Sequence, residues 1–283
     1  MKKDKTHIHW YPGHIAKAER KLKEQLSLVD AVIEVLDARI PLSSGYDNIA
    51  GLLKDKPRLI LFNKSDLADK AKLKAFAEKI EAESGFPVIL SDAKNSKDLN
   101  QIVKKAVELS EPRIQAIMKK GLLRRPARVM VVGMPNVGKS SIINKLTRSS
   151  KTKIGAKAGV TRQQQWVRIN PQLDLLDTPG IIPMKQDDQS RAQKLAFVNS
   201  VSENAYSNEI VAEELLKLLA EKYPQIVKDY YKLENEIKLE SIATSRNWIK
   251  TGGEADLERT AIYILRDFRE GKIGKFVLDD IEG

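Results

Sequence analysis

A glycine-rich segment that ends in lysine and serine carries the clearest chemistry in the sequence. Gly133-Met-Pro-Asn-Val-Gly-Lys-Ser140 matches the pattern G-x-x-x-x-G-K-[ST] and lies between an apolar run and a segment of helical period. Such a loop curls its backbone N–H groups around nucleotide phosphates, and its lysine reaches the β- and γ-oxygens. A simple glycine-rich turn is the alternative, which the flanking segments disfavour. Phosphate contacts are expected from Asn136, Val137, Gly138, Lys139, Ser140 and Ser141.

A second motif on the phosphate side begins at Asp177. Asp177-Thr-Pro-Gly180 ends an apolar run some forty residues after the glycine-rich loop. At that spacing Asp177 would hold Mg²⁺ together with the Ser140 hydroxyl, and the Gly180 N–H would sense the γ-phosphate. Thr161, between the two motifs, is predicted to bind Mg²⁺ and the γ-phosphate as a switch threonine. Taken singly, Asp-Thr-Pro-Gly is also an ordinary turn, and Thr161 an ordinary loop residue.

Two further segments would read a guanine base. Asn63-Lys-Ser-Asp66 follows an apolar run, and the Asp66 carboxylate can accept two hydrogen bonds from guanine N1–H and its exocyclic amine. Ser91-Asp-Ala-Lys94 follows the next apolar run and would offer the Ala93 N–H to guanine O6. Two coincidental loops at strand ends are the alternative, which the pair together disfavours. Guanine contacts are expected from Asn63, Lys64, Asp66, Ser91, Ala93 and Lys94.

Apolar periodicity predicts the elements that position these motifs. Short runs bounded by turn formers predict strands at residues 31–36, 58–62, 87–90, 128–132, 166–169 and 173–176. Helical periods between them cover residues 70–84, 99–120 and 140–146, which predicts an α/β domain with a mostly parallel sheet. Helix then follows helix at residues 190–206, 210–223, 225–233, 241–249 and 254–270. We therefore expect an α/β domain over residues 1–182 and a small all-helical domain over residues 183–283.

The motifs occur in rotated order. The base motifs lie before residue 95 and the phosphate motifs after residue 132, whereas most GTPases have the reverse order. Cutting the usual domain after Asp-x-x-Gly and joining its old ends gives this arrangement, and permutation is tolerated where termini are close and exposed. The sequence thus predicts a circularly permuted P-loop GTPase domain. The chain leaves it next to the nucleotide-sensing loop, so that hydrolysis could move an attached helical domain.

Charge is unevenly distributed along the 283 residues, whose formal net charge is +11. No acidic residue occurs from Pro112 to Leu173, a stretch with fourteen Lys or Arg, whereas residues 183–283 carry 15 basic and 19 acidic side chains. The basic stretch predicts phosphate or RNA as a neighbour, although a solubilising face gives the same composition. The absence of cysteine excludes disulfides and thiolate metal sites, and no apolar run is long enough to span a membrane.

From end to end the sequence resembles the circularly permuted GTPases of the ribosome biogenesis GTPase A family. Besides the motifs above, the resemblance rests on Trp10-Tyr-Pro-Gly-His14-Ile-Ala-Lys-Ala18, Asp37-Ala-Arg-Ile-Pro41 and Asp267-Phe-Arg-x-Gly271-Lys-x-Gly274. It implies a role in late assembly of the large ribosomal subunit and a helical domain that contacts RNA. Because residues 183–283 are acidic overall, that contact needs a local basic face such as Lys272 and Lys275.

The usual place for a water-positioning glutamine, after Asp-x-x-Gly, holds Ile181 and Ile182. Isoleucine cannot orient water, so hydrolysis is expected to be slow or to use a group from elsewhere. The resemblance points to His14 as the catalytic candidate beside Lys139, Thr161 and Gly180, and a buried structural histidine is the alternative. Asn136 resembles the asparagine with which related GTPases bind K⁺ beside the phosphates, or it is simply a turn former.

These features predict a GTP-binding and GTP-hydrolysing switch that uses Mg²⁺ and, through Asn136, K⁺. Its expected partners are GTP or GDP and the large (50S) ribosomal subunit with its rRNA, and the subunit is expected to activate it. A GTPase with another RNA client, such as tRNA modification, and a nucleotide-gated RNA-binding scaffold are the alternatives. Intact Lys139, Ser140, Asp177 and Asp66 argue against an inactive scaffold. We expect a cytoplasmic protein with no membrane partner.

Overall fold

Six strands form one sheet in a computed structural model that describes residues 20, 22–46, 49–54, 56–92, 95–149, 165–177 and 188–281. The strands are β1 Ala31–Asp37, β2 Arg58–Asn63, β3 Val88–Ser91, β4 Ala127–Val132, β5 Gln165–Asn170 and β6 Leu173–Asp177. Their spatial order is β3-β2-β1-β4-β6-β5, and only β5 of these strands runs antiparallel to its neighbour. The predicted α/β class with a mostly parallel sheet is confirmed.

Helices cover both faces of the sheet, as the alternation of buried residues along β1 requires. Ile33 and Val35 join one apolar cluster with α4 and α5, whereas Val32 and Leu36 join two clusters on the opposite face with α2 and α3. Both faces of a parallel sheet must be covered because its strands are apolar on both sides. The helices of this part are α2 Ile49–Leu53, α3 Lys70–Ser84, α4 Ser96–Met118 and α5 Lys139–Ser149.

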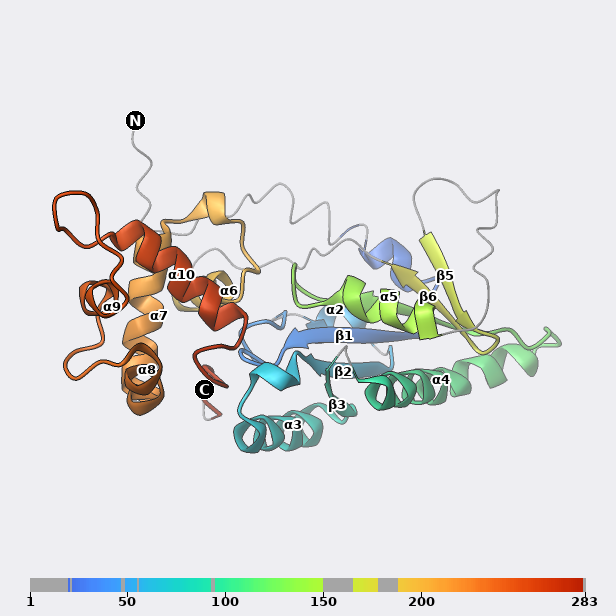
Figure 1. The fold of residues 1–283 in the computed structure, drawn as a ribbon. Coiled ribbons are helices and arrows are strands. Elements are labelled where there is room, and N and C mark those ends of the chain that lie inside the picture. Colours follow the sequence, from blue (N-terminus) through green and yellow to red (C-terminus); the bar gives the residue numbers. More distant parts are fainter. Residues whose placement is uncertain are drawn as a thin grey trace.

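After β6, the elements that the structure describes are all helical. They are α6 Gln189–Phe197, the 3₁₀ turn Glu203–Ala205, α7 Asn208–Lys222, α8 Pro224–Tyr231, α9 Leu239–Ser245 and α10 Leu257–Arg269. Figure 1 shows them gathered at one end of the molecule, beyond the end of the sheet to which β1 leads. Their core is continuous with the α4–α5 face of the sheet. The division of the chain at residues 182 and 183 stays a prediction, because both lie outside the described residues.

The helix predicted over residues 190–206 is present, but its predicted end is wrong, because α6 spans Gln189–Phe197. Asn199 has a positive φ of 62°, which no helix continues through, and a 3₁₀ turn follows at Glu203–Ala205. Arg269, at the end of α10, donates hydrogen bonds to the carbonyl oxygens of Ala196 and Phe197 at 3.0 and 3.1 Å. These contacts satisfy carbonyls that a longer α6 would have used itself.

Helix α9 is also shorter than predicted. The helix predicted at residues 241–249 ends at Ser245, and Ile249 pairs instead with Ala255 in an isolated antiparallel bridge. Among the helices in the described ranges, none combines the length and the apolar character that crossing a bilayer demands.

Arg269 should contribute strongly to stability, because its guanidinium also binds Glu203 at 2.7 Å and the Tyr206 hydroxyl at 2.9 Å. Arg269→Ala leaves these polar groups without their partner, and we expect the free energy of unfolding to fall by about 3 kcal/mol. Arg266→Ala, which removes an exposed arginine on the same helix stacked over Tyr263, should cost less than about 1 kcal/mol. Urea unfolding measures both variants, and equal losses would contradict this role of Arg269.

Candidate nucleotide site

The carboxyl ends of the parallel strands bring the separated motifs to one edge of the sheet. β1 lies between β2 and β4. The register aligns Asp37 of β1 with Asn63 of β2, and Asn63 with Ser91 of β3. The base motifs thus lie on one side of β1, while the phosphate loop after β4 and the end of β6 lie on the other. Ligands of open α/β sheets bind at such an edge, and the permuted chain order leaves this spatial arrangement intact.

Two glycines let the phosphate loop pass close to its neighbours. Gly133 has φ 151°, and a Cβ there would lie 2.4 Å from the carbonyl oxygen of Val35. Gly138 has φ 102°, and a Cβ there would lie 2.1 Å from Asn63 Nδ2. Neither contact is possible for a residue with a side chain. The spacing of the two glycines in the sequence is therefore set by the approach of two different strand ends.

The start of α5 presents the polar groups of the loop. Lys139 is buried, and its Nζ donates to the carbonyl oxygens of Gly133 at 2.9 Å and Met134 at 2.7 Å. These bonds hold the ammonium across the loop. Ser140 and Ser141 are exposed in the first turn of α5, where backbone N–H groups and the helix dipole favour an anion. The arrangement suits phosphate binding.

Asn63 ties the guanine side to the phosphate side. Its Nδ2 donates to the carbonyl oxygen of Val137 at 2.7 Å. Asn63 Oδ1 and Ser91 Oγ are buried and have no hydrogen-bond partner among the described residues. Asp66 lies half-buried in the 3₁₀ turn Ser65–Leu67 that follows. Buried polar atoms of this kind normally find a partner, so this corner has unused hydrogen-bonding capacity on the side predicted to hold the base.

A buried carboxylate fixes the lysine of the guanine motif. Lys64 has a positive φ of 61°, and its Nζ donates to Asp37 Oδ2 at 2.9 Å and to the carbonyl oxygen of Asn136 at 2.7 Å. Asp37 also accepts two side-chain hydrogen bonds from Arg39, at 2.9 and 2.8 Å. Burial alone would raise the pKa of Asp37, but the charges and hydrogen bonds of Arg39 and Lys64 outweigh it and hold the pKa well below its ordinary value.

Helical residues after β6 contact the phosphate loop directly. Asn136, which has φ 58°, donates from Nδ2 to the carbonyl oxygen of Asn199 at 2.6 Å. The buried Ser200 donates from Oγ to the carbonyl oxygen of Pro135 at 2.8 Å. Both partners belong to the turn that ends α6. A displacement of Pro135 and Asn136 would therefore also displace the residues that follow α6.

The C-terminal end of the chain binds the opposite, guanine side. Arg39 donates from Nη1 to the carbonyl oxygen of Arg269 at 3.3 Å, and its guanidinium lies 5.3 Å from the ring centre of Phe268. Leu278 N donates to the carbonyl oxygen of Arg39 at 2.8 Å, and Phe276 N to that of Leu67 at 3.2 Å. The helical part thus contacts the loops after β1, β2 and β4, all at the candidate site.

The structure brings together most of the predicted site residues that it describes. Asn136, Val137, Gly138, Lys139, Ser140 and Ser141 form the phosphate loop and first helical turn, with Asn63, Lys64, Asp66 and Ser91 beside them. His14, Ala93, Lys94, Thr161, Gly180, Ile181 and Ile182 lie outside the described residues, as does the side chain of Asp177, whose backbone ends β6. The individual roles of all these residues stay predictions.

Sequence reasoning missed four contributors to this edge. Asp37 and Arg39 lie in the motif Asp37-Ala-Arg-Ile-Pro41, which by itself assigns them no role, although an Asp at the end of an apolar strand signals this edge of the sheet. Asn199 and Ser200 gave no signal, since they fall within a segment predicted as helix. Within the described ranges, no three or more His, Cys, Asp or Glu side chains cluster as a metal site.

Replacing Asp37 by Asn should destabilise the protein in a pH-dependent way. The folded-state pKa lies below the ordinary 3.8, so the folded protein keeps the carboxylate ionised where the unfolded chain takes up a proton. We expect Asp37→Asn to lower the free energy of unfolding by about 3–5 kcal/mol at pH 7, with a smaller difference below about pH 4 as the wild type loses this contribution.

Urea unfolding at pH 7 and pH 3.5 measures the effect of Asp37→Asn. Asp229→Asn serves as the control, because Asp229 is exposed and far along α8. The control should change stability by less than about 0.5 kcal/mol at both pH values. A loss in Asp37→Asn that is equal at the two pH values would contradict the ionised state of Asp37.

Comparison with known proteins assigns the fold and the site to a family. A family model described as "50S ribosome-binding GTPase" matches residues 128–240. The chain is 39% identical over 272 residues to ribosome biogenesis GTPase A of Bacillus licheniformis, covering 94% of this chain and 96% of the relative. It is 32% identical over 270 residues to the Thermotoga maritima protein of that name, covering 95% and 92%.

Solved structures agree with this assignment. A GDP-bound YlqF structure matches with a TM-score of 0.66 at 27% identity and covers 93% of this chain and 100% of that one. GNP-bound YlqF from T. maritima matches with a TM-score of 0.62 at 27% identity, covering 94% and 100%. With a phosphate loop and a guanine motif meeting at one sheet edge in rotated chain order, and with these relatives matching nearly end to end, the chain is a circularly permuted P-loop GTPase that belongs to the ribosome biogenesis GTPase A family.

Proposed function

We propose that this GTPase acts as a switch in late assembly of the large (50S) ribosomal subunit, and that the subunit accelerates its hydrolysis of GTP. The observation that carries the proposal is a pair of contacts from the helical part. Asn199 accepts a hydrogen bond from Asn136 of the phosphate loop, and Phe276 N donates to the carbonyl oxygen of Leu67, the residue that follows the guanine motif. Through these contacts, a change of bound nucleotide would shift the position of the helices. Relatives carry ribosome biogenesis in their names, which supports the choice of client.

The nucleotide would be held by the two motif groups acting together. Asp66 accepts hydrogen bonds from guanine, with Asn63, Lys64, Ser91, Ala93 and Lys94 shaping the base pocket. The loop amides of residues 136–141 and Lys139 bind the phosphates. Ser140, Thr161 and Asp177 would hold Mg²⁺, which when bound neutralises charge on the β- and γ-oxygens. The Asn136 side-chain oxygen would hold K⁺, while its Nδ2 binds Asn199.

Hydrolysis of GTP would be slow until the large ribosomal subunit binds. Ile181 and Ile182 provide no group that orients water, so the resting hydrolysis rate is low. His14 would be brought to the γ-phosphate when the N-terminal segment meets the subunit, and Thr161 and Gly180 would sense the γ-phosphate. Closing a loop over the substrate in this way ties hydrolysis to occupancy of the client.

The basic part of the chain would supply the attraction to rRNA in the cytoplasm. Lys145 and Arg148 are exposed on α5, and Lys119 and Lys120 at the end of α4. In the helical domain over residues 183–283, Lys272 lies 2.5 Å from Glu270 and offers little charge to RNA, whereas Lys275 is exposed. The proposed interface with rRNA therefore lies mainly on the GTPase domain, with Lys275 as a local addition.

Base selectivity tests the guanine assignment. Asp66→Asn replaces a carboxylate that accepts from the guanine amine by an amide that can donate to the xanthine carbonyl. We expect the variant to prefer XTP over GTP by about tenfold or more in a competition assay, with the fold retained because Asp66 is half-buried at the site. Asp69→Asn, at the first residue before α3, is the control and should keep GTP preference. Retained GTP preference in Asp66→Asn would refute the assignment.

Stimulated turnover tests the client and the catalytic group. In single-turnover hydrolysis, purified large subunits should accelerate the wild type, and the acceleration should weaken as salt rises because phosphate contacts release counterions. His14→Ala should bind GTP and the subunit normally but lack the acceleration, and His7→Ala serves as a matched control in the same N-terminal segment. Full stimulation of His14→Ala by the large subunit would refute the catalytic role of His14. If the large subunit did not stimulate the wild type, the proposed ribosomal partner would be refuted.

A further inference from the structure

Three apolar side chains are exposed close together in the sequence at the end of α4. Met118, Leu122 and Leu123 are 38%, 61% and 91% exposed, and no other large apolar side chain in the described ranges is more than 46% exposed. We call residues 118–123 the α4 tip. A single exposed leucine is ordinary on a protein surface, whereas a group of exposed apolar side chains indicates a contact site.

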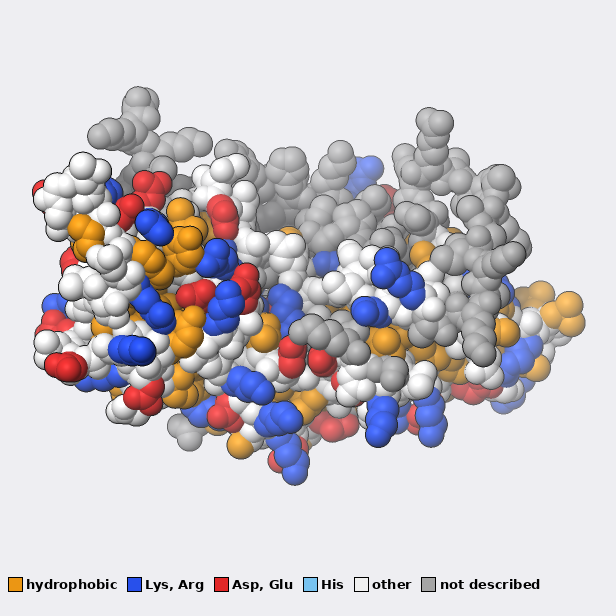
Figure 2. Space-filling model, viewed as in Figure 1, with side chains coloured by type: hydrophobic (Ala, Val, Ile, Leu, Met, Phe, Trp, Pro, Cys, Tyr) orange, Lys and Arg blue, Asp and Glu red, His pale blue; other side chains and the backbone are white. Residues whose placement is uncertain are grey.

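The α4 tip lies away from the nucleotide site. Figure 1 shows the end of α4 and the loop after it at the end of the molecule opposite the helices that follow β6. Figure 2 shows apolar side chains, with basic side chains beside them, at that same end. The tip comes before the amino-terminal end of β4, whereas the nucleotide motifs follow the carboxyl ends of the strands. A partner bound at the tip would therefore leave the nucleotide edge open.

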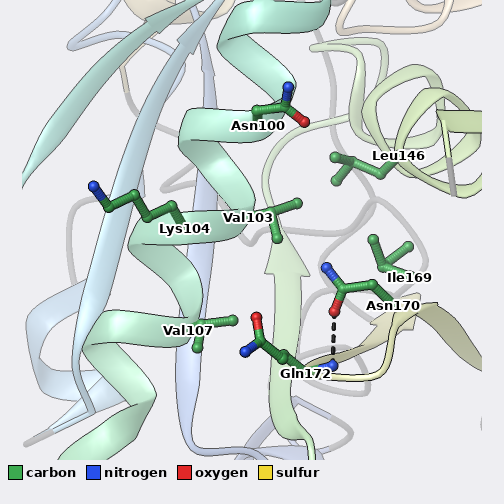
Figure 3. Close-up of a pocket in the computed structure, with 8 residues that line it drawn as sticks. All are labelled: Asn100, Val103, Lys104, Val107, Leu146, Ile169, Asn170 and Gln172. Carbon is green, nitrogen blue, oxygen red and sulfur yellow. Dashed lines mark hydrogen bonds between the residues drawn. The ribbon is translucent and has the colours of Figure 1, made fainter.

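The body of α4 gives the tip a fixed support. Val103 and Val107 of α4 pack against the main core, to which the buried Leu146 and Ile169 belong. Figure 3 shows Val103 pointing toward Leu146 and Ile169. Ile114, about one helical turn before the tip, is also buried in this core. Packing thus holds the helix almost to the point where its exposed end begins.

Two arginine pairs fix the chain where it leaves the tip. Arg124 donates from its two Nη atoms to the two carboxylate oxygens of Glu111 in α4, each at 2.8 Å. Arg125 donates in the same way to the buried Asp30, at 2.7 and 2.8 Å. Such two-bond pairs set direction as well as distance. A loop held at both ends loses less conformational entropy when it binds, so the exposed leucines suit docking to a preformed surface.

The tip also carries positive charge that its neighbours do not compensate. Lys119 and Lys120 are exposed, and within the described part of the chain no carboxylate pairs with either of them. The carboxylates of Glu111 and Asp30 are already bound by the two arginines. The sequence has no acidic residue between residues 112 and 173. A partner that complements the tip must therefore offer negative charge beside an apolar surface.

An rRNA surface would satisfy the lysines but not the leucines. Proteins bind unpaired bases by stacking them on aromatic rings or on the planes of arginine side chains. Residues 118–125 contain no aromatic side chain, and both of their arginines are held by carboxylates. A protein pocket with an apolar floor and carboxylates at its rim accounts for both features of the tip, because interfaces combine an apolar centre with a polar rim.

We propose that the α4 tip docks into such a pocket on a protein of the large ribosomal subunit, with its two leucines on the apolar floor and with Lys119 and Lys120 facing carboxylates at the rim. The inference rests on the proposed function, because it names the kind of partner that the GTPase meets on the subunit. The attraction to rRNA would then come mainly from the exposed Lys145 and Arg148 of α5.

Paired serine substitutions test the apolar contact. Leu122→Ser combined with Leu123→Ser removes both leucines, and because both are exposed, circular dichroism and GTP binding should match the wild type. Sedimentation with purified large subunits at constant salt should show association weakened about tenfold or more, since apolar burial at the interface is lost. Ile262→Ser, at an exposed isoleucine of α10, is the control and should weaken association by less than about twofold.

Cross-linking identifies the class of partner. The chain has no cysteine, so Leu123→Cys provides a single thiol for a diazirine maleimide, which on illumination inserts into protein and RNA alike. On purified large subunits we expect one protein of the subunit to be cross-linked, at a peptide in which mass spectrometry finds apolar residues next to Asp or Glu. Ile262→Cys, labelled in the same way, should not cross-link that peptide.

Equal association of the doubly substituted protein and the wild type would overturn the proposal, as would cross-linking of Leu123→Cys only to rRNA or to a second copy of this chain. In these cases, association of the wild type with the subunit would leave the proposed function standing. Failure of the wild type to associate would refute the proposed function and this docking surface together.

Discussion

The ionised carboxylate of Asp37 is the constraint on which the nucleotide edge depends. It is fully buried at the end of β1, where an isolated charge would be strongly disfavoured, so it requires both Arg39 and Lys64. Lys64, whose backbone has a positive φ of 61°, also donates from Nζ to the carbonyl oxygen of Asn136 in the phosphate loop. Removing the carboxylate would leave two cations facing each other across this edge.

From Asp37 and Arg39, a series of contacts leads into the helical part and back to the phosphate loop. Arg39 binds the carbonyl of Arg269 and packs on Phe268, and Arg269 in turn closes the end of α6 through Ala196 and Phe197. The turn that follows α6 binds the phosphate loop through Asn199 and Ser200. The permutation explains why this is possible, because α6 is the next element after β6 in the part of the chain that the structure describes. A closed ring of contacts therefore links base motif, phosphate loop and helices.

The sequence allowed the sheet, the motif loops and the family to be predicted, because each depends on local patterns. Apolar runs located all six strands, and the two loop glycines reflected backbone approaches that only glycine permits, at Val35 and at Asn63. The end of α6 could not be predicted, because it is set by Arg269, which is more than seventy residues away in the chain. The partners of Asp37 also depend on tertiary contacts, which leave no periodic signal.

Amide hydrogen exchange of the full-length protein, with and without GTP or GDP, tests the ring of contacts most directly. The informative segments are residues 195–201 at the end of α6 and residues 266–279 at the end of the chain, both of which contact the nucleotide loops. We predict that nucleotide binding slows exchange in both segments as well as in the phosphate loop, because the contacts that link the loops to the helices are stabilised together. Protection confined to the phosphate and guanine loops, with unchanged exchange in the helical segments, would contradict the account.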